Sequence, residues 1–99
     1  MQYNFAWDPK KARYNLRKHR VSFERAAEIF FDPSAISILD EENRDQEERW
    51  VTLGKDSHGI ALVIVHTFRE ESENQWNVRI ISARKATKKE RKQYEEGAK

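Results

Sequence analysis

After Pro33 the spacing of apolar residues changes from about every third or fourth position to every second position. Four strand-like segments follow: AISILD, RWVTLGK, IALVIVHTFR and WNVRIISARK. The connections between the last three, KDSHG and EESENQ, are rich in turn-forming residues and too short for a helical crossover. The pattern therefore predicts a four-stranded antiparallel meander and does not favour a parallel sheet. The acidic stretch DEENRDQEE between the first two strands is expected to be an exposed loop.

The residues before Pro33 favour two helices. Asp8 is placed to cap a helix that opens with Pro9 and continues through KKARYNLRKH to about residue 19. Ser22 is a second capping candidate, and an Asp32-Pro33 pair ends the segment that it starts. The apolar stripe of this second helix consists of Phe23, Ala26, Ala27, Phe30 and Phe31.

A third helix is predicted at the C-terminal end. Thr87 and Glu90 have the capping-box spacing, and Gly97 suits the end of a helix that covers about residues 88–96. Two helices, a sheet and a final helix make a two-layer α+β arrangement, which we expect to form one domain over residues 1–99. One face of the sheet should pack on helices, and the other should be partly open to solvent.

The composition supports a folded protein and excludes several kinds of chemistry. The chain is 37% hydrophobic and 11% aromatic, which is too rich in large apolar residues for disorder although 36% of residues are charged. It has no cysteine, so disulfides, thiolate catalysis and zinc held by sulfur are excluded.

The N-terminus lacks the apolar core of a signal peptide, and the longest apolar run, residues 60–65, is too short to span a bilayer. We expect a soluble cytoplasmic protein without a membrane partner.

Charge is segregated along the chain although the net charge is only +2. Residues 1–25 carry seven Lys or Arg against two acids, and residues 76–99 carry eight against three. Residues 26–50 carry two basic residues against eight acids. If the fold brings both basic ends onto one face, that face suits a phosphate backbone. The alternative is that these runs are only the solvated faces of helices.

Several familiar catalytic motifs are absent from the sequence. The three histidines, His19, His58 and His66, fall in different predicted elements, and neither HExxH nor the spacing of a calcium-binding loop occurs. The glycines are isolated, so a phosphate-binding glycine loop is not expected, and no G-x-S-x-G motif occurs. We therefore expect neither a dedicated metal site nor a cofactor.

Polar residues cluster around the last two strands and the last helix. His66, Arg69, Arg79, Arg84 and Lys85 lie at or near strand ends, and Tyr94 follows Glu90 by one helical turn. Metal-free RNA cleavage needs a base for the 2′-OH, cations for the phosphorane charge and an acid for the leaving oxygen, and this set contains all three types. The same arginines could be ordinary surface residues, and His66 could be a hydrogen-bonded residue of the sheet. Trp7 and Trp50 are assigned to packing, with Trp76 placed at a strand edge.

Four blocks of the sequence occur in a characteristic order: FAWDPKKARYNLRKHRVSF, ERWVTLGK, ALVIVHTFRE and VRIISARKATKKERKQYEE. Through these blocks the sequence resembles, over nearly its whole length, the BrnT toxins of bacterial type II toxin–antitoxin modules. The resemblance implies a RelE-like fold and a ribonuclease activity that halts translation. It also implies neutralisation by a BrnA-like antitoxin, whose ribbon-helix-helix part binds DNA.

The resemblance extends to individual positions. The matching polar residues are His66, Arg69, Arg79, Arg84, Glu90 and Tyr94, and the KH pair of the family corresponds to Lys18 and His19. The implied mechanism is attack of a ribose 2′-OH on the adjacent phosphate, with the three arginines stabilising charge and His66 or Glu90 exchanging protons. Tyr94 would orient the substrate or act as acid. Contacts to RNA are expected from Lys18, His19, Lys85, Lys88 and Lys89.

The chain departs from the family pattern at two places. The family usually has glycine where this chain has Arg20, and glycine suits a left-handed helix end. The EESEN segment also lengthens the last hairpin, which leaves the register between His66 and Arg79 open. Two alternative functions remain open from the sequence: a non-catalytic module that binds RNA or the ribosome, and a domain that binds only protein.

Overall fold

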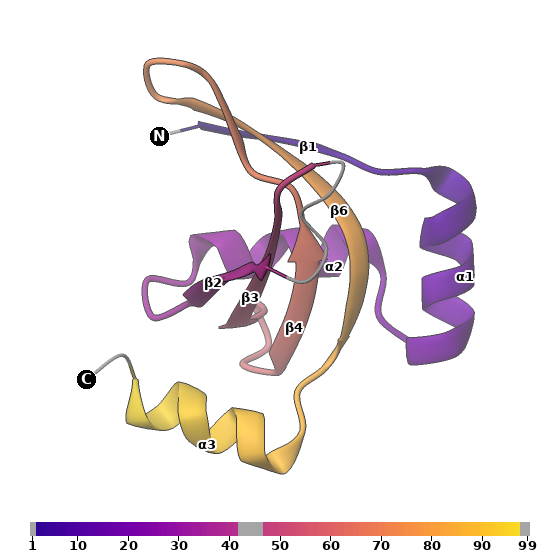
Figure 1. Cartoon of the computed structure of the whole chain (residues 1–99). Helices are drawn as coiled ribbons and strands as arrows, with labels where there is room; N and C mark the ends of the chain where they lie inside the picture. Colours follow the sequence, from indigo (N-terminus) through magenta and orange to yellow (C-terminus); the bar gives the residue numbers. More distant parts are fainter. Residues whose placement is uncertain (1, 42–46, 98–99) are drawn as a thin grey trace.

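The computed structural model describes residues 2–41 and 47–97 of the chain. Within them it has an α+β fold of three α-helices, one 3-10 helix and a six-stranded mixed sheet (Figure 1). The elements are β1 (Gln2–Ala6), α1 (Pro9–His19), α2 (Phe23–Ala27), η1 (Glu28–Phe31), β2 (Ile36–Asp40), β3 (Arg49–Lys55), β4 (Ala61–His66), β5 (Arg69–Ser72), β6 (Gln75–Lys85) and α3 (Lys88–Glu96). Most of the acidic stretch that we expected to be a loop, residues 42–46, lies outside the described residues.

The sheet contains the predicted antiparallel strands and two strands that the pattern did not show. Its order is β1-β6-β4-β3-β2, and β5 pairs with β6. The pairs β2/β3, β3/β4 and β4/β6 are antiparallel, as expected. The expectation of a purely antiparallel sheet was wrong, because β1 runs parallel to β6, with Gln2 opposite Gln75 and Ala6 opposite Arg79. Nearly the whole chain connects these two strands, so the pair needs no local crossover (Figure 1).

The hairpin before β6 also differs from the prediction. The expected strand over residues 60–69 ends at His66, and the chain returns to the sheet as β5, whose Arg69 lies opposite Asn77. A register shift between Val65 and His66 marks the bend. Asn74 makes the turn with a φ of 72°, a conformation that Asn tolerates better than most residues. Part of the EESEN segment is therefore strand.

The main hydrophobic core lies between one face of the sheet and the N-terminal helices. It consists of Val21, Phe23, Ala26, Ile29, Leu62, Ile64, Val78, Ile80 and Ala83. We call this side of the sheet the covered face. Gly54 of β3 faces Ile29 of η1, and a Cβ at this position would lie only 3.1 Å from the Cβ of Ile29, which is closer than most real contacts. Because glycine has no Cβ, β3 and η1 can approach each other closely.

The opposite side of the sheet, which we call the open face, carries a smaller cluster. Ala61, Val63 and Ala86 are buried there, with Val51 and Leu53 packed against them. α3 contacts β3, and Ile38 of the edge strand is 62% exposed. The expectation of one packed and one partly open face is therefore met. No helix within the described ranges is long and apolar enough to cross a membrane.

The helix ends match the capping residues predicted from sequence. The Asp8 carboxylate accepts the N–H of Lys10 at 2.8 Å, and the Ser22 hydroxyl accepts the N–H of Arg25 at 3.1 Å. Thr87 and Glu90 form both hydrogen bonds of a capping box. Arg20 takes the left-handed conformation, with a φ of 59°, and its N–H bonds to the Leu16 carbonyl at 2.9 Å. The chain thus keeps this helix end without glycine.

Asn15 connects α1 to β6 inside the protein. It is 4% exposed, and its amide donates to the carbonyls of Val21 at 3.0 Å and Ala83 at 2.8 Å. Its oxygen accepts the Ala83 N–H at 3.1 Å. The amide side chain therefore replaces a neighbouring strand beside Ala83, where β1 no longer runs.

Candidate functional site

Three of the predicted arginines lie on the open face of the sheet. Arg79 lies between Val78 and Ile80, which are both buried in the main core, so its side chain leaves the opposite side of the strand. Arg84 follows buried Ala83 and lies opposite Val63 of the smaller cluster. Arg69 lies opposite Asn77 and therefore shares the face of Arg79. The fold thus assembles three guanidinium groups from β5 and β6 on one surface.

A fourth cation, Arg49, belongs to the same face and was missed. It precedes Val51 of the smaller cluster by two residues in β3, and alternation puts both on one side. The same period of two, applied to RWVTLGK, could have identified it. It lies in an earlier strand than the polar residues that cluster in the sequence around the last two strands and the last helix.

Glu90 holds Arg84 in a fixed position. The two groups form paired hydrogen bonds, from Nη1 to Oε1 at 2.8 Å and from Nη2 to Oε2 at 2.9 Å. The same carboxylate accepts the backbone N–H of Thr87 at 2.8 Å. The bonds from Arg84 lower the pKa of Glu90 to about 2, and those to Glu90 raise the pKa of Arg84. Glu90 is therefore ionised, and both of its oxygens are occupied.

Arg79 is paired with an acid beside the acidic segment. Its guanidinium donates to Glu47, and both side chains are partly exposed. Its backbone is held by Thr67, whose hydroxyl accepts the Arg79 N–H at 3.1 Å and whose N–H donates to the Arg79 carbonyl at 3.0 Å. The strand at Arg79 is thus fixed, while an exposed ion pair of this kind exchanges readily with another anion.

His66 lies on the covered face and is not brought together with the arginines. It is 2% exposed, and it lies opposite Ile80 of the main core. Its Nε2 is 2.6 Å from the Thr52 hydroxyl, and its Nδ1 is 2.9 Å from the Thr67 carbonyl oxygen. Burial lowers the pKa of His66, so the ring is neutral at neutral pH. These contacts fit the alternative given above, that His66 is a hydrogen-bonded residue of the sheet.

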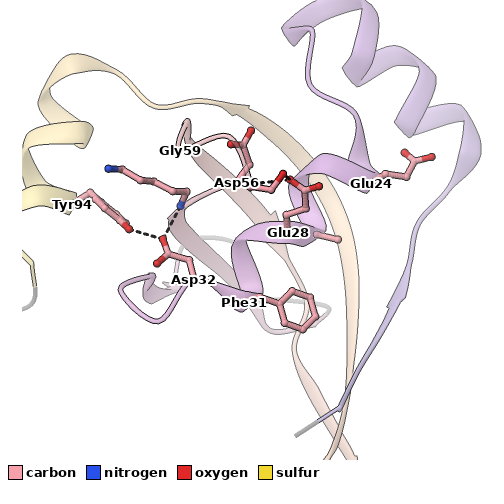
Figure 2. Close-up of a pocket in the computed structure, with 10 residues that line it drawn as sticks. Glu24, Glu28, Phe31, Asp32, Asp56, Gly59 and Tyr94 are labelled. Atoms are coloured by element: carbon pink, nitrogen blue, oxygen red, sulfur yellow. Dashed lines mark hydrogen bonds between the residues drawn. The ribbon is translucent and has the colours of Figure 1, made fainter.

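Tyr94 is also placed away from the arginines. Its hydroxyl donates to Asp32 Oδ2 at 2.6 Å, and the backbone N–H of Lys55 donates to the same oxygen at 2.8 Å (Figure 2). The ammonium of Lys55 lies 5.1 Å from the centre of the tyrosine ring. Burial and the bond to Asp32 raise the pKa of Tyr94. Tyr94 therefore docks α3 on the segment that follows η1.

The pocket in Figure 2 has a volume of about 720 Å³ and is acidic. It is lined by Glu24, Ala27, Glu28, Phe31, Asp32, Lys55, Asp56, Ser57, Gly59 and Tyr94. Besides Asp32, two of its carboxylates have local partners: Asp56 accepts from Arg25 at 2.5 Å, and Glu28 accepts from the Ser57 hydroxyl at 2.9 Å. Within residues 2–41 and 47–97, no three His, Cys, Asp or Glu side chains are grouped to hold a metal ion.

The five residues predicted to contact RNA outside this set are spread over the molecule. Lys18 and His19 end α1, which packs on the covered face through Ala12. Lys85 lies opposite Leu62 of the main core and so belongs to the covered face. Lys88 and Lys89 are exposed on α3, where they line a hollow with Arg91, Lys92 and Glu95. Lys18, His19 and Lys85 therefore lie on the covered side, and Lys88 and Lys89 lie on α3.

Comparisons with known proteins identify the family. A search of the curated proteins found no match. The crystal structure of the Brucella abortus ribonuclease toxin, BrnT, is similar to this chain, with a TM-score of 0.64 and 18% sequence identity. The similarity covers 89% of this chain and 100% of that one, and it shows a shared fold. The model of the family described as "Ribonuclease toxin, BrnT, of type II toxin-antitoxin system" matches residues 7–90. The chain therefore belongs to the BrnT family of ribonuclease toxins of type II toxin–antitoxin systems.

Proposed function

We propose that this toxin cleaves RNA without a metal ion and thereby inhibits translation, using the open face of a RelE-like fold as its site. The observation that carries the proposal is the set of arginines, Arg69, Arg79 and Arg84, that β5 and β6 place on one surface. Rigid strands present these groups, which is the arrangement that electrostatic stabilisation of a transition state requires.

The proposed reaction is an internal phosphoryl transfer. The ribose 2′-oxygen attacks the adjacent phosphorus, and its proton passes to a base. The bond from phosphorus to the 5′-oxygen breaks, and that oxygen takes up a proton. The products are a 2′,3′-cyclic phosphate and a free 5′-hydroxyl. The arginines stabilise the negative charge that grows on the phosphorane.

Of the two proposed proton acceptors, Glu90 is the one in contact with an arginine. At a pKa of about 2 its carboxylate is a weak base. A phosphate that binds Arg84 competes with Glu90 for the guanidinium and so removes the main cause of the low pKa. Glu90 then becomes a better proton acceptor when substrate is bound. His66 and Tyr94 act indirectly in this scheme, by fixing β4 and α3.

The partner that we propose is a BrnA-like ribbon-helix-helix antitoxin in a hetero-oligomer in the cytoplasm, with DNA bound only through the antitoxin. Type II toxins have an antitoxin, and this chain offers an open sheet face with exposed Arg79 and exposed Ile38. A mixed cationic and apolar surface of this kind is suited to a protein partner.

A non-catalytic module that binds RNA or the ribosome is the second candidate. The observation that favours it is the position of His66, the one histidine of the proposed catalytic set, on the face opposite the arginines.

One experiment distinguishes the two candidates. The purified protein is incubated with single-stranded and structured RNA in EDTA, and the product ends are analysed. We expect cleavage that leaves 2′,3′-cyclic phosphate or 3′-phosphate ends. A requirement for Mg²⁺, or 5′-phosphate ends, contradicts the proposed mechanism. RNA that shifts in a gel and is not shortened supports the binding module.

A further inference from the structure

A second pocket, with a volume of about 510 Å³, lies on the covered face beside η1. It is lined by Tyr3, Phe30, Asp32, Ala35, Ser37, Glu48, Trp50, Thr52, His66, Phe68 and Trp76. Phe68 and Trp76 stack with centres 4.6 Å apart and planes 6° apart. Phe30 meets the His66 ring edge to face at 4.7 Å. The walls are therefore flat aromatic surfaces, which suit a flat aromatic ligand.

A chain of hydrogen bonds with a fixed direction ends in this pocket. The Thr67 carbonyl can only accept, so the Nδ1–H of His66 donates to it, at 2.9 Å. Nε2 of the neutral ring must then accept, and the Thr52 hydroxyl donates to it at 2.6 Å. Since the Thr52 proton is used, the Ser37 hydroxyl donates to Thr52 at 2.7 Å. Buried His66 thus determines the orientation of a hydroxyl two groups away.

The consequence is that Ser37 offers only acceptor lone pairs to a ligand. Its side chain is on an exposed residue of β2 and lines the pocket. Glu48, also exposed, adds a carboxylate acceptor. The pocket therefore fits a flat ring that donates hydrogen bonds at its edge.

The pocket and Arg79 lie on opposite faces of the sheet, and neighbouring residues along the chain connect them. Glu47 pairs with Arg79, and the next residue, Glu48, lines the pocket. Thr67 bonds to the backbone of Arg79 and lies between two lining residues, His66 and Phe68.

We propose that this pocket binds one unpaired nucleobase with an exocyclic amino group: adenine, cytosine or guanine. The inference rests on the proposed function for the identity of the ligand as RNA. The amino group would donate to Ser37, and the ring would lie against Phe68 and Trp76. A basic side chain of a protein partner fits less well, because both oxygens of Asp32 already accept hydrogen bonds, from Ser34, Lys55 and Tyr94.

The test measures binding separately from cleavage. Fluorescein-labelled 2′-O-methyl hexanucleotides cannot react, and four of them carry A, C, G or U at one central position among uridines. We expect fluorescence anisotropy to show about tenfold tighter binding of the A, C and G oligomers than of the U oligomer. Ser37→Ala should reduce this preference about five- to tenfold, while Ser72→Ala, on exposed β5 outside the pocket, should keep it.

The aromatic wall is tested in the same assay. Trp76→Ala should weaken binding of all four oligomers about tenfold, and Trp76→Phe should restore most of the loss because a stacking surface remains. Equal binding of the four oligomers, or no effect of Ser37→Ala and Trp76→Ala, overturns the pocket proposal. So does binding of a short arginine-rich peptide that Trp76→Ala abolishes while oligomer binding is unchanged.

Different experimental results would reject the pocket proposal and the proposed enzymatic function. Cleavage of RNA without a base preference leaves the proposed function intact and rejects the pocket. Base-selective binding of the oligomers with no cleavage of unmodified RNA keeps the pocket and rejects the enzyme.

Discussion

Glu90 shows how one side chain serves both the fold and the site. It closes the capping box of α3 and binds Arg84 through both oxygens. Its spacing from Thr87 predicted the first role from sequence. The second could not be predicted, because the partner, Arg84, belongs to β6, and only the position of α3 against the sheet decides which cation Glu90 meets.

We expect Glu90→Gln to lower stability by about 1 kcal/mol at neutral pH, after allowance for solvent screening of a partly exposed pair. A carboxyl whose pKa falls on folding, here from 4.5 to about 2, stabilises the fold above pH 4.5. That contribution disappears as the pH falls from 4.5 towards about 2. Urea unfolding at several pH values should show the difference between wild type and variant shrinking over this range. A difference that is constant with pH contradicts the assigned pair.

Buried Asn15 is the polar residue whose replacement we expect to lower the stability of the fold most. Asn15→Leu leaves the N–H and C=O of Ala83 and the carbonyl of Val21 without their partner, and should cost about 2–4 kcal/mol. Urea unfolding measures it. The control is Asn77→Leu at an exposed position, which should change stability by about 0.5 kcal/mol or less. Equal effects of the two changes contradict the role given to Asn15.

At the scale of elements, caps and strong periodicity predicted the structure well. All three α-helices begin at the capping residues identified from sequence, Asp8, Ser22 and Thr87. β1 was missed because QYNFA is short and stands just before a strong helix start, and its partner β6 is about seventy residues away. β5 was missed because its four residues, Arg69–Ser72, are all polar or charged and exposed, so no apolar alternation marks them.

Arg20 provides a test at the end of a helix. Its left-handed conformation costs about 1–2 kcal/mol, and glycine avoids that cost while losing about 0.5–1 kcal/mol to the freedom of the unfolded chain. Arg20→Gly should therefore raise stability by about 0.5–1 kcal/mol, which thermal unfolding can measure. The matched control, Arg17→Gly inside α1, should lower stability by about 1 kcal/mol. A destabilising Arg20→Gly contradicts the inferred strain.

At the scale of the whole molecule, the strand positions of the arginines were easier to predict from the sequence than the surroundings of His66 and Tyr94. WNVRIISARK alternates clearly enough that its arginines fall opposite buried residues. IALVIVHTFR is nearly all apolar, so alternation could not decide which face His66 takes. Tyr94 follows Glu90 on α3, but its hydroxyl reaches Asp32, whose position depends on the segment after η1. The position of a residue along its strand or helix could be predicted from the sequence, but the residues that it contacts in other elements could not.

The central claim is that the arginines of the open face stabilise the transition state of RNA cleavage. The most direct measurement is the single-turnover cleavage rate in EDTA for wild type and four variants: Arg79→Ala, Arg84→Ala, Lys88→Ala and Lys89→Ala. We predict that either arginine change lowers the rate about 10²- to 10³-fold with the fold intact. Either lysine change, on exposed α3, should weaken RNA binding only modestly and reduce its salt dependence. Equal, small losses in all four variants would contradict the claim and leave a diffuse cationic surface in its place.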